Sequence, residues 1–229
     1  MAGTKQLKYG AIPQNDYVLI VGAGPSTKTC LDKVKMCIKK YRPLIFAANY
    51  NFESEGIYSN YTYITDPDKF VENIHTINSD LIIPFKLKYM LNYNKQSKKY
   101  CSLHNVFIAG DSTKFDYLTN NEIKIKKDGS IKMNFFGIAG FGAMTVATVA
   151  KPKHMLIVGI DDPKKNKDHK FTYQGKRTDY LKPEKCTKVI NYFEQILIPL
   201  IKSKNINIET FKEVSLLGFS KKRLGIKIL

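Results

Sequence analysis

A glycine-rich turn, Gly22-Ala-Gly-Pro-Ser26, is the first stretch whose residue types could do chemistry. The apolar run 17–21 leads directly into it, and a helix-period segment with apolar positions from Leu31 to Tyr41 follows. A strand, a glycine turn and a helix in this order present backbone N–H groups and the positive end of a helix dipole to an anion, usually a phosphate. Pro25 suits the first helical turn, where its missing N–H would be unpaired anyway. The turn therefore predicts a phosphate site.

The spacing of the glycines indicates which class of nucleotide the turn could bind. Thr27 stands where the dinucleotide fingerprint G-x-G-x-x-G would have its third glycine. NAD and FAD are therefore disfavoured, and a mononucleotide is expected. Ser26 or Thr27 can cap the helix or donate to a phosphate oxygen. The alternative is a tight turn that binds no ligand.

Polar side chains also follow three other apolar runs. They are Asn49 after 44–48, Asp66 after 61–65 and Asp161 after 154–160. If these runs are parallel strands, their carboxyl ends lie at one edge of a sheet, where ligands of α/β folds bind. We therefore expect the turn and these residues to form one site.

The carboxylates of this set have alternative roles. Asp161 and Asp162 could hold Mg²⁺ between nucleotide phosphates. Adjacent side chains of an extended chain point apart, so we favour one functional carboxylate, Asp161, and assign no metal ligand. Asp161 could instead only accept hydrogen bonds from the backbone of the glycine turn. Asp66 could equally be the N-cap of a helix that starts near Asp68.

His169 is the best candidate for a general base. Imidazole titrates near neutrality, as a base for an acceptor hydroxyl must. Tyr173 could donate a hydrogen bond to a leaving phosphate. The alternative is a solvated histidine without a role. The other histidines, in helix or strand contexts, are interpreted as structural: His75, His104 and His154.

The elements that must position these residues read as an α/β fold. Strands alternate with helical segments, which predicts a Rossmann-like, mainly parallel sheet flanked by helices. Further strands are expected at 80–84, 106–108 and, as a late pair, within 206–217. Residues 123–133 predict a β-hairpin around Asp128-Gly129, because lysines alternate with apolar residues there.

The remaining segments complete the predicted organisation. We expect residues 1–15 to be an N-terminal extension and 16–229 to be a single nucleotide-binding domain. The lysine-rich residues 162–183 predict a polar lid. Residues 137–142 open a helix of small residues, residues 189–201 predict a long amphipathic helix, and residues 219–229 a basic tail.

Composition limits the compartment. No window of about 18 apolar residues exists, so no membrane span is expected. Residues 1–10 lack the apolar stretch of a secretory signal. The four cysteines form no C-x-x-C pair and predict buried thiols in a reducing compartment. A cytoplasmic location follows, with peripheral contact at the inner face of a membrane as a further expectation.

A net charge of +17 has three interpretations. The first is that the charge has no function and reflects a general bias of composition, since the chain is rich in Lys, Asn, Ile and Tyr. The second is an acidic acceptor or an anionic membrane surface. The third is nucleic acid. Because the lysines are scattered in pairs and arginine occurs only at positions 42, 177 and 223, we expect no specific nucleic-acid partner.

Through these residues, the chain resembles two related protein groups that share a G-x-G-P-S start. One is the bacterial lipooligosaccharide sialyltransferase type, which uses a CMP-activated sugar. The other contains motility-accessory flagellin glycosyltransferases and the archaeal 6-hydroxymethylpterin pyrophosphokinase. The matching pieces, in order, are 22–26, Asn49, Asp66-Pro67, 137–142 and the strand that ends Val158-Gly-Ile-Asp161.

The resemblance implies a role for each matched residue. Asn49 would hold the ribose or the sugar, and Asp161 would reach the nucleotide. Asp66 stands where the wider family has Asp and the sialyltransferases tend to have Asn. The residues that would line the nucleotide phosphate or complete its site are Gly22, Gly24, Pro25, Ser26 and Gly140.

The chain also departs from the sialyltransferase pattern. Residues 135–140 carry neither the arginine nor the Thr-Ser pair found there before the Gly-rich helix. The catalytic histidine of that type has no counterpart at its spacing beyond Asp161. These departures count against CMP-sialic acid itself but not against nucleotide-dependent transfer.

Three functions therefore remain open. The first is a glycosyltransferase with a nucleotide-sugar donor, CMP-linked as first expectation, and a cell-surface glycan, glycolipid or protein acceptor. The second is an ATP- and Mg²⁺-dependent pyrophosphokinase acting on a pterin-like small molecule. The third is a non-enzymatic module that senses nucleotides or binds nucleic acid.

Overall fold

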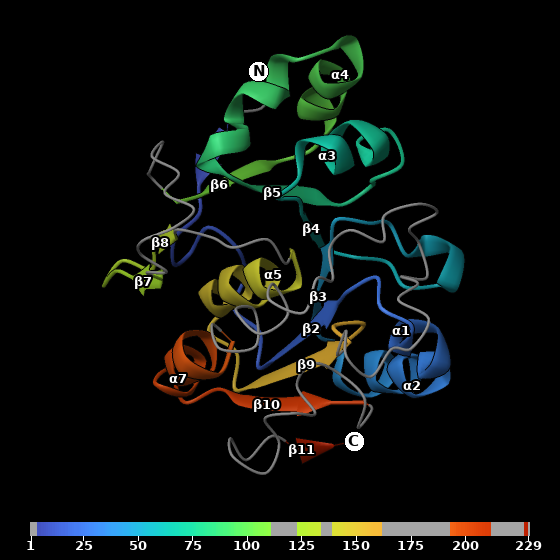
Figure 1. The fold of residues 1–229 in the computed structure, drawn as a ribbon, viewed down its shortest axis with the longest axis vertical. Helices are drawn as coiled ribbons and strands as arrows, with labels where there is room; N and C mark the ends of the chain where they lie inside the picture. The colour runs from blue at the N-terminus through green and yellow to red at the C-terminus, as the bar shows by residue number, and fades with distance from the viewer. Residues whose placement is uncertain (1–3, 111–122, 134–138, 162–192, 212–226, 229) are drawn as a thin grey trace.

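The computed structural model describes residues 4–110, 123–133, 139–161, 193–211 and 227–228 (Figure 1). Within these residues, nine strands form one sheet in the order β1-β6-β5-β4-β3-β2-β9-β10-β11. All its neighbouring strands run parallel, which confirms the α/β fold class. The strands are β1 (Thr4–Gln6), β2 (Tyr17–Val21), β3 (Leu44–Ala48), β4 (Tyr61–Tyr63), β5 (Asp80–Pro84), β6 (Val106–Ala109), β9 (His154–Val158), β10 (Asn207–Thr210) and β11 (Lys227–Ile228).

The central strands are continuous apolar runs because both faces of the sheet are covered. Residues 18–21 of β2 and 155–158 of β9 are almost wholly buried. Their side chains alternate between two cores. Val18 and Ile20 belong to one core and Leu19 and Val21 to the other.

Helices occupy both faces, as Figure 1 shows. One face carries α2, α3, η2 and α4, whose side chains pack on β2 to β6. The opposite face carries α5, η5 and α7. The bounds are α1 (Ser26–Thr29), α2 (Leu31–Tyr41), η1 (Glu53–Glu55), α3 (Pro67–Asn73), η2 (Phe85–Asn92), α4 (Lys95–Leu103), α5 (Ala139–Ala147), η3 (Thr148–Ala150), η5 (Phe193–Leu197) and α7 (Ile198–Lys202).

The small residues of α5 let it approach the sheet closely. All nine of its residues are buried. A Cβ atom on Gly142 would collide with the ring of Tyr63 in β4. The predicted helix of small residues is therefore confirmed, and its glycines are explained by packing.

The hairpin is also confirmed. β7 (Ile123–Ile125) and β8 (Ile131–Met133) pair antiparallel outside the main sheet. Asp128 Oδ1 accepts hydrogen bonds from the backbone N–H and the hydroxyl of Ser130, and Gly129 has φ +79°. The Asp-Gly turn thus forms as the sequence predicts.

Other segments differ from the sequence-based expectations. Thr4–Gln6 of the expected extension pairs with β6, and Lys227–Ile228 of the expected basic tail pairs with β10. Residues 86–99, for which no element was expected, lie largely in η2 and α4. The strands expected over 61–65 and 154–160 end at Tyr63 and Val158.

Some expectations are covered only in part. Of the long helix expected over 189–201, residues 193–201 are helical, first as the π-helix η5 and then as α7, which extends to Lys202. Residues 189–192 lie outside the described residues. The late strand pair is represented by β10, since residues 212–217 lie outside the described residues. The predicted lid, 162–183, also lies outside them. None of the described helices is both long and apolar enough to cross a bilayer.

Candidate functional site

The topology places the candidate site where β2 and β9 lie side by side. From β2 the chain proceeds through β3, β4, β5 and β6 in one direction across the sheet, and from β9 through β10 and β11 in the other. Open α/β sheets bind ligands outside the carboxyl ends of the strands at such a switch point. The glycine turn after β2 and residues 159–161 after β9 meet there.

Four residues lock these two strand ends together, and we call them the turn clamp: Gly24, Ser26, Gly159 and Asp161. Ser26 N donates to Asp161 Oδ2 at 2.7 Å, and Gly159 N donates to Ser26 Oγ at 2.8 Å. Gly24 N donates to the Gly159 carbonyl at 2.8 Å. Ser26 is only 2% exposed. The hydrogen bond from the backbone of the turn to Asp161 is therefore confirmed, and contact of Asp161 with a nucleotide stays a prediction.

The turn clamp explains the glycine spacing of the motif. A Cβ atom on Gly24 would collide with the Asp161 carboxylate and the Gly159 carbonyl, and one on Gly22 with the same carbonyl. Gly159 has φ +73°, a backbone conformation that favours glycine. The glycines are thus required by the close approach of two strand ends, with or without a ligand.

The turn also uses most of its own hydrogen-bond donors. Gly22 N donates to the Val158 carbonyl at 2.9 Å, and the N–H groups of Gly24 and Ser26 are engaged in the clamp. Pro25 has no N–H. Within the described part of the chain, the N–H of half-buried Ala23 has no hydrogen-bond partner. Phosphate binding by the turn stays a prediction, and Ala23 is the residue that could contribute a backbone donor.

Helix capping, one of the two alternatives for Ser26 and Thr27, is wrong. Neither Ser26 nor Thr27 caps α1 with its side chain. Thr27 Oγ1 instead donates to the Gly22 carbonyl at 2.6 Å, which closes the turn on itself. The expected single helix is also divided, because α1 ends at Thr29 and α2 begins at Leu31.

Asn49 fastens the next two strand ends. It has φ +64°, which asparagine tolerates better than most residues. Its backbone N–H donates to the Tyr63 carbonyl at 2.9 Å, and its Oδ1 accepts from Thr65 N at 3.2 Å. Asn49 therefore holds the carboxyl ends of β3 and β4 together at the expected edge, and its contact with a ribose or sugar stays a prediction.

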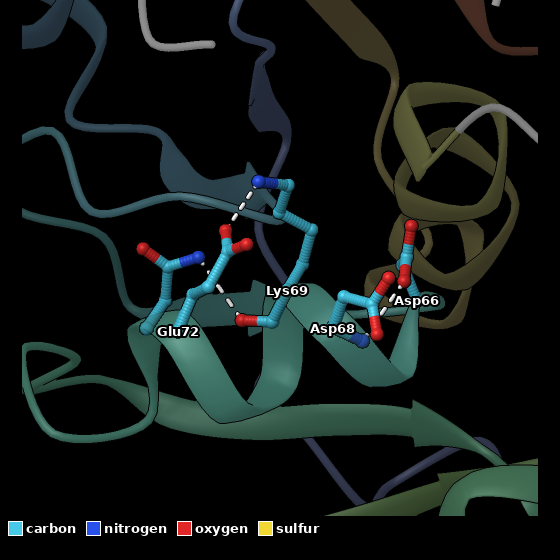
Figure 2. A network of polar contacts seen from close by, with 5 residues as sticks. Asp66, Asp68, Lys69 and Glu72 are labelled. Atoms are coloured by element: carbon cyan, nitrogen blue, oxygen red, sulfur yellow. Dashed lines mark hydrogen bonds and ion pairs between the residues drawn. The ribbon is translucent and has the colours of Figure 1, made fainter. Parts of the chain in front are cut away.

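Asp66 is the N-cap of α3, which confirms one of its two interpretations. Its Oδ1 accepts from Asp68 N at 2.9 Å, and Pro67 occupies the first helical position (Figure 2). In the next turn the Lys69 ammonium pairs with Glu72 and lies 5.4 Å from the centre of the Tyr50 ring. Burial lowers the pKa of Lys69, but the hydrogen bond to Glu72 and the nearby Tyr50 outweigh it, so that the pKa is raised.

Lys86 is a further candidate site residue, which the sequence analysis does not name. It lies two residues beyond the carboxyl end of β5, next to the strand that ends near Asp66. Burial lowers the pKa of this half-buried amine, while the charge of Asp66 partly opposes the shift. The signal was available, since Lys86 follows an apolar strand as Asn49 and Asp66 do.

The remaining candidates are Gly140 and three residues outside the described part of the chain. Gly140 faces Ile160, because a Cβ atom there would lie 2.6 Å from Ile160 Cδ1. This contact packs α5 against the segment that carries Asp161, and nucleotide binding by Gly140 stays a prediction. His169, Tyr173 and Asp162 lie outside the described residues. No group of three or more His, Cys, Asp or Glu within the described residues could hold a metal ion.

The histidines interpreted as structural lie away from the clamp or on the surface. His154 begins β9 at the amino edge of the sheet, where its ring stacks on Tyr17 at 4.6 Å and its Nδ1 lies 3.0 Å from Glu209 Oε1. His104 stacks on Tyr100, with ring centres 4.5 Å apart. His75 is exposed.

Comparison with known proteins supports the fold. No family model and no curated protein matches the sequence. Among solved structures, the chain is similar to the MAf glycosyltransferase from Magnetospirillum magneticum AMB-1, with a TM-score of 0.55 and 11% identity. The match covers 90% of this chain and 33% of the other, so the chain spans about a third of that protein's length. At this identity the likeness shows a shared Rossmann-like α/β fold.

The turn clamp predicts a coupled loss of stability. Ser26→Ala leaves the buried Gly159 N–H without its acceptor, and Asp161→Ala does the same to Ser26 N. Each change should lower the free energy of unfolding by about 1–3 kcal/mol. Because the two residues share one network, the double variant should deviate from additivity by about 0.5 kcal/mol or more. Urea denaturation of the two single variants and the double variant measures both effects.

Ser102→Ala is the matched control for this cycle. The Ser102 hydroxyl is exposed and donates to the Lys99 carbonyl in the last turn of α4. Its removal should change the free energy of unfolding by less than about 0.5 kcal/mol. If Ser26→Ala is as mild as Ser102→Ala, or if the two clamp variants are additive, the clamp does not hold the strand ends together.

Proposed function

We propose that this protein is a glycosyltransferase that takes its sugar from a nucleotide-activated donor, with a CMP-linked donor as first choice. One observation carries the proposal. The turn clamp at the β2–β9 switch point stands in one row with Asn49, Asp66 and Lys86 at the carboxyl ends of consecutive parallel strands. This row combines amide, carboxylate and ammonium groups where α/β folds bind nucleotides.

The comparison supports the transferase class. The MAf protein is a glycosyltransferase by name and shares the sheet architecture over 90% of this chain. Four of the matched pieces of the G-x-G-P-S resemblance follow strand ends at this same edge: 22–26, Asn49, Asp66-Pro67 and Asp161. The donor's base and the acceptor rest on that resemblance alone, which favours a cell-surface glycan, glycolipid or protein acceptor.

The proposed chemistry assigns the groups by charge. The Lys86 ammonium and the Ala23 N–H suit the donor phosphate, while Asn49 and Asp66 suit hydroxyl groups of the ribose or the sugar. His169 would accept the proton of the acceptor hydroxyl as its oxygen bonds to the anomeric carbon. The bond from that carbon to the phosphate oxygen breaks, and Tyr173 would donate a hydrogen bond to the leaving phosphate.

Nucleotide binding is the first test. In a thermal-shift panel, CMP, UDP or GDP should stabilise the protein without added metal. A nucleotide at 100 times its Kd stabilises the native state by about 2.7 kcal/mol. Lys86→Gln should raise the Kd of that nucleotide about tenfold or more, because a charged hydrogen bond to the phosphate is lost. Lys88→Gln, two residues further on and exposed, is the matched control and should leave the Kd within about twofold.

Two outcomes would contradict the proposal. Stabilisation by ATP only when Mg²⁺ is present would favour a pyrophosphokinase that acts on a pterin-like molecule. No response to any nucleotide, together with salt-sensitive binding of RNA or DNA, would exclude both enzymes. Equal losses of nucleotide affinity in the Lys86 and Lys88 variants would show that Lys86 does not contact the nucleotide.

The base assignment has its own test. His169→Ala should lower kcat by about 100-fold or more and leave the nucleotide Kd unchanged, because the variant removes a proton acceptor and no donor contact. Hydrolysis or transfer of the stabilising nucleotide's sugar conjugate provides the assay. His75→Ala, which removes an exposed histidine of the α3 region, should retain full turnover. Retained turnover in His169→Ala would exclude this residue as the base.

A further inference from the structure

The end of the molecule formed by η2 and α4 is rich in lysine. Residues 85–103 contain five lysines and no acidic residue, and residues 81–110 contain no Asp or Glu at all. The two elements lie at the opposite end of the molecule from β10 and β11 (Figure 1). Their inward side chains, among them Leu87, Met90 and Tyr100, pack on β5 and β6.

The helical spacing of α4 places its lysines on one outward stripe. Lys95, Lys98 and Lys99 are exposed, and Leu103 follows on the same stripe one turn later. Ser97 and Tyr100 occupy the opposite stripe and are buried. α4 is thus amphipathic, and its charged outer face ends in an exposed leucine.

Exposed tyrosines accompany the lysines. Tyr89 and Tyr93 are 62% and 64% exposed, and Leu103 is 68% exposed. Lys88 lies between Phe85 and Tyr89 and is also exposed, with its ammonium 5.8 Å from the centre of the Phe85 ring. We call this surface the η2–α4 face: Lys88, Tyr89, Tyr93, Lys95, Lys98, Lys99 and Leu103.

We propose that the η2–α4 face docks on an anionic lipid bilayer. Lysines near such a surface are attracted by its negative potential, and tyrosines favour the interface between headgroups and acyl chains. Stable membrane attachment generally needs two signals, and here a polybasic patch is combined with exposed apolar groups. The exposed leucine fits an acyl boundary better than a polynucleotide, and the segment contains no arginine.

The acidic residues nearest to this face lie on neighbouring elements. The adjacent α3 carries Asp68 and Glu72, but Glu72 is paired with Lys69 (Figure 2). The edge strand β1, which pairs with β6, adds the exposed Lys5. Asp80 accepts hydrogen bonds from Asn105 just beyond α4, and the charge of Asp66 acts on Lys86 of η2. The η2–α4 face itself contains four lysines and no acidic residue.

A second lysine-rich helix shows why charge alone does not select the surface. α2 exposes Lys33, Lys35 and Lys39, but Asp32 lies in its first turn. Lys35 also lies beside Gly56, at the end of the acidic element η1. This helix also exposes Lys40, has mixed charge and exposes no tyrosine. It therefore provides a control in which three lysines can be replaced, as in α4.

Docking would bring the candidate site close to the membrane. η2 begins directly after the carboxyl end of β5, and its second residue is Lys86. The η2–α4 face therefore adjoins the edge of the sheet that carries the site. The docking proposal does not depend on nucleotide transfer, and its test contains no nucleotide.

Vesicle pelleting tests the proposal directly. The wild-type chain should bind vesicles that contain about 30 mol% phosphatidylglycerol and should not bind vesicles of phosphatidylcholine alone. The triple variant Lys95→Gln, Lys98→Gln, Lys99→Gln should lose about 100-fold in partition coefficient. The pair Tyr89→Ser, Tyr93→Ser should bind several-fold more weakly without any change in net charge. Circular dichroism verifies that each variant is folded.

The matched control removes the same charge elsewhere. Lys33→Gln, Lys35→Gln, Lys39→Gln should keep the partition coefficient within about threefold, since only the general charge has fallen. An equal loss in both triple variants would overturn the proposal, because it would show attraction by net charge alone. Absence of wild-type binding would also overturn it. So would binding of a single-stranded oligonucleotide that depends on the two tyrosines while the vesicles are ignored.

Discussion

The hydrogen bonds between Ser26 and the Gly159–Asp161 segment are the constraint on which the rest of the site depends. β2 and β9 belong to the two oppositely directed halves of the sheet, and the turn clamp joins their carboxyl ends. Charge-assisted hydrogen bonds in a buried setting contribute more than neutral ones and leave costly unpaired groups when broken. The clamp therefore fixes the position of the turn relative to its neighbouring strands.

This constraint changes the meaning of the glycine motif. A sequence that looks like a phosphate cradle uses most of its N–H groups to hold two strand ends together, and its glycines avoid collision with Asp161 and Gly159. The groups that we propose to contact a ligand are then the neighbours of the clamp: Ala23, Asn49, Asp66 and Lys86. In this proposal the motif holds two strand ends in place, and the residues after the following strands provide the polar side chains of the site.

Much of this arrangement could be predicted from the sequence, for identifiable physical reasons. Strands buried on both faces are continuous apolar runs, so β2, β3, β5 and β9 were readily found. The polar residues after them share one edge because parallel strands end together. The short edge strands β1 and β11 were missed because their pairing depends on a neighbour and not on their own apolar pattern. η2 and α4 were missed because lysines and tyrosines obscure their buried stripe.

The hydrogen bond between Ser26 and Asp161 could not be predicted from the sequence. Ser26 and Asp161 are 135 residues apart, and only the fold shows that one bonds to the other. The position of Lys86 after an apolar strand can be read from the sequence, but its half-burial and the nearby charge of Asp66 are visible only in the fold. His169 and Tyr173 remain sequence-based proposals.

The most direct measurement is amide chemical-shift mapping of the wild-type chain during titration with the nucleotide that stabilises it most. The account expects the largest saturable shifts at Ala23, Asn49, Asp66 and Lys86, with the hairpin at 123–133 and α7 unaffected. Saturable shifts that cluster at the hairpin, at α7 or around His154 at the amino edge, with none at the carboxyl ends of β2 to β5, would contradict it.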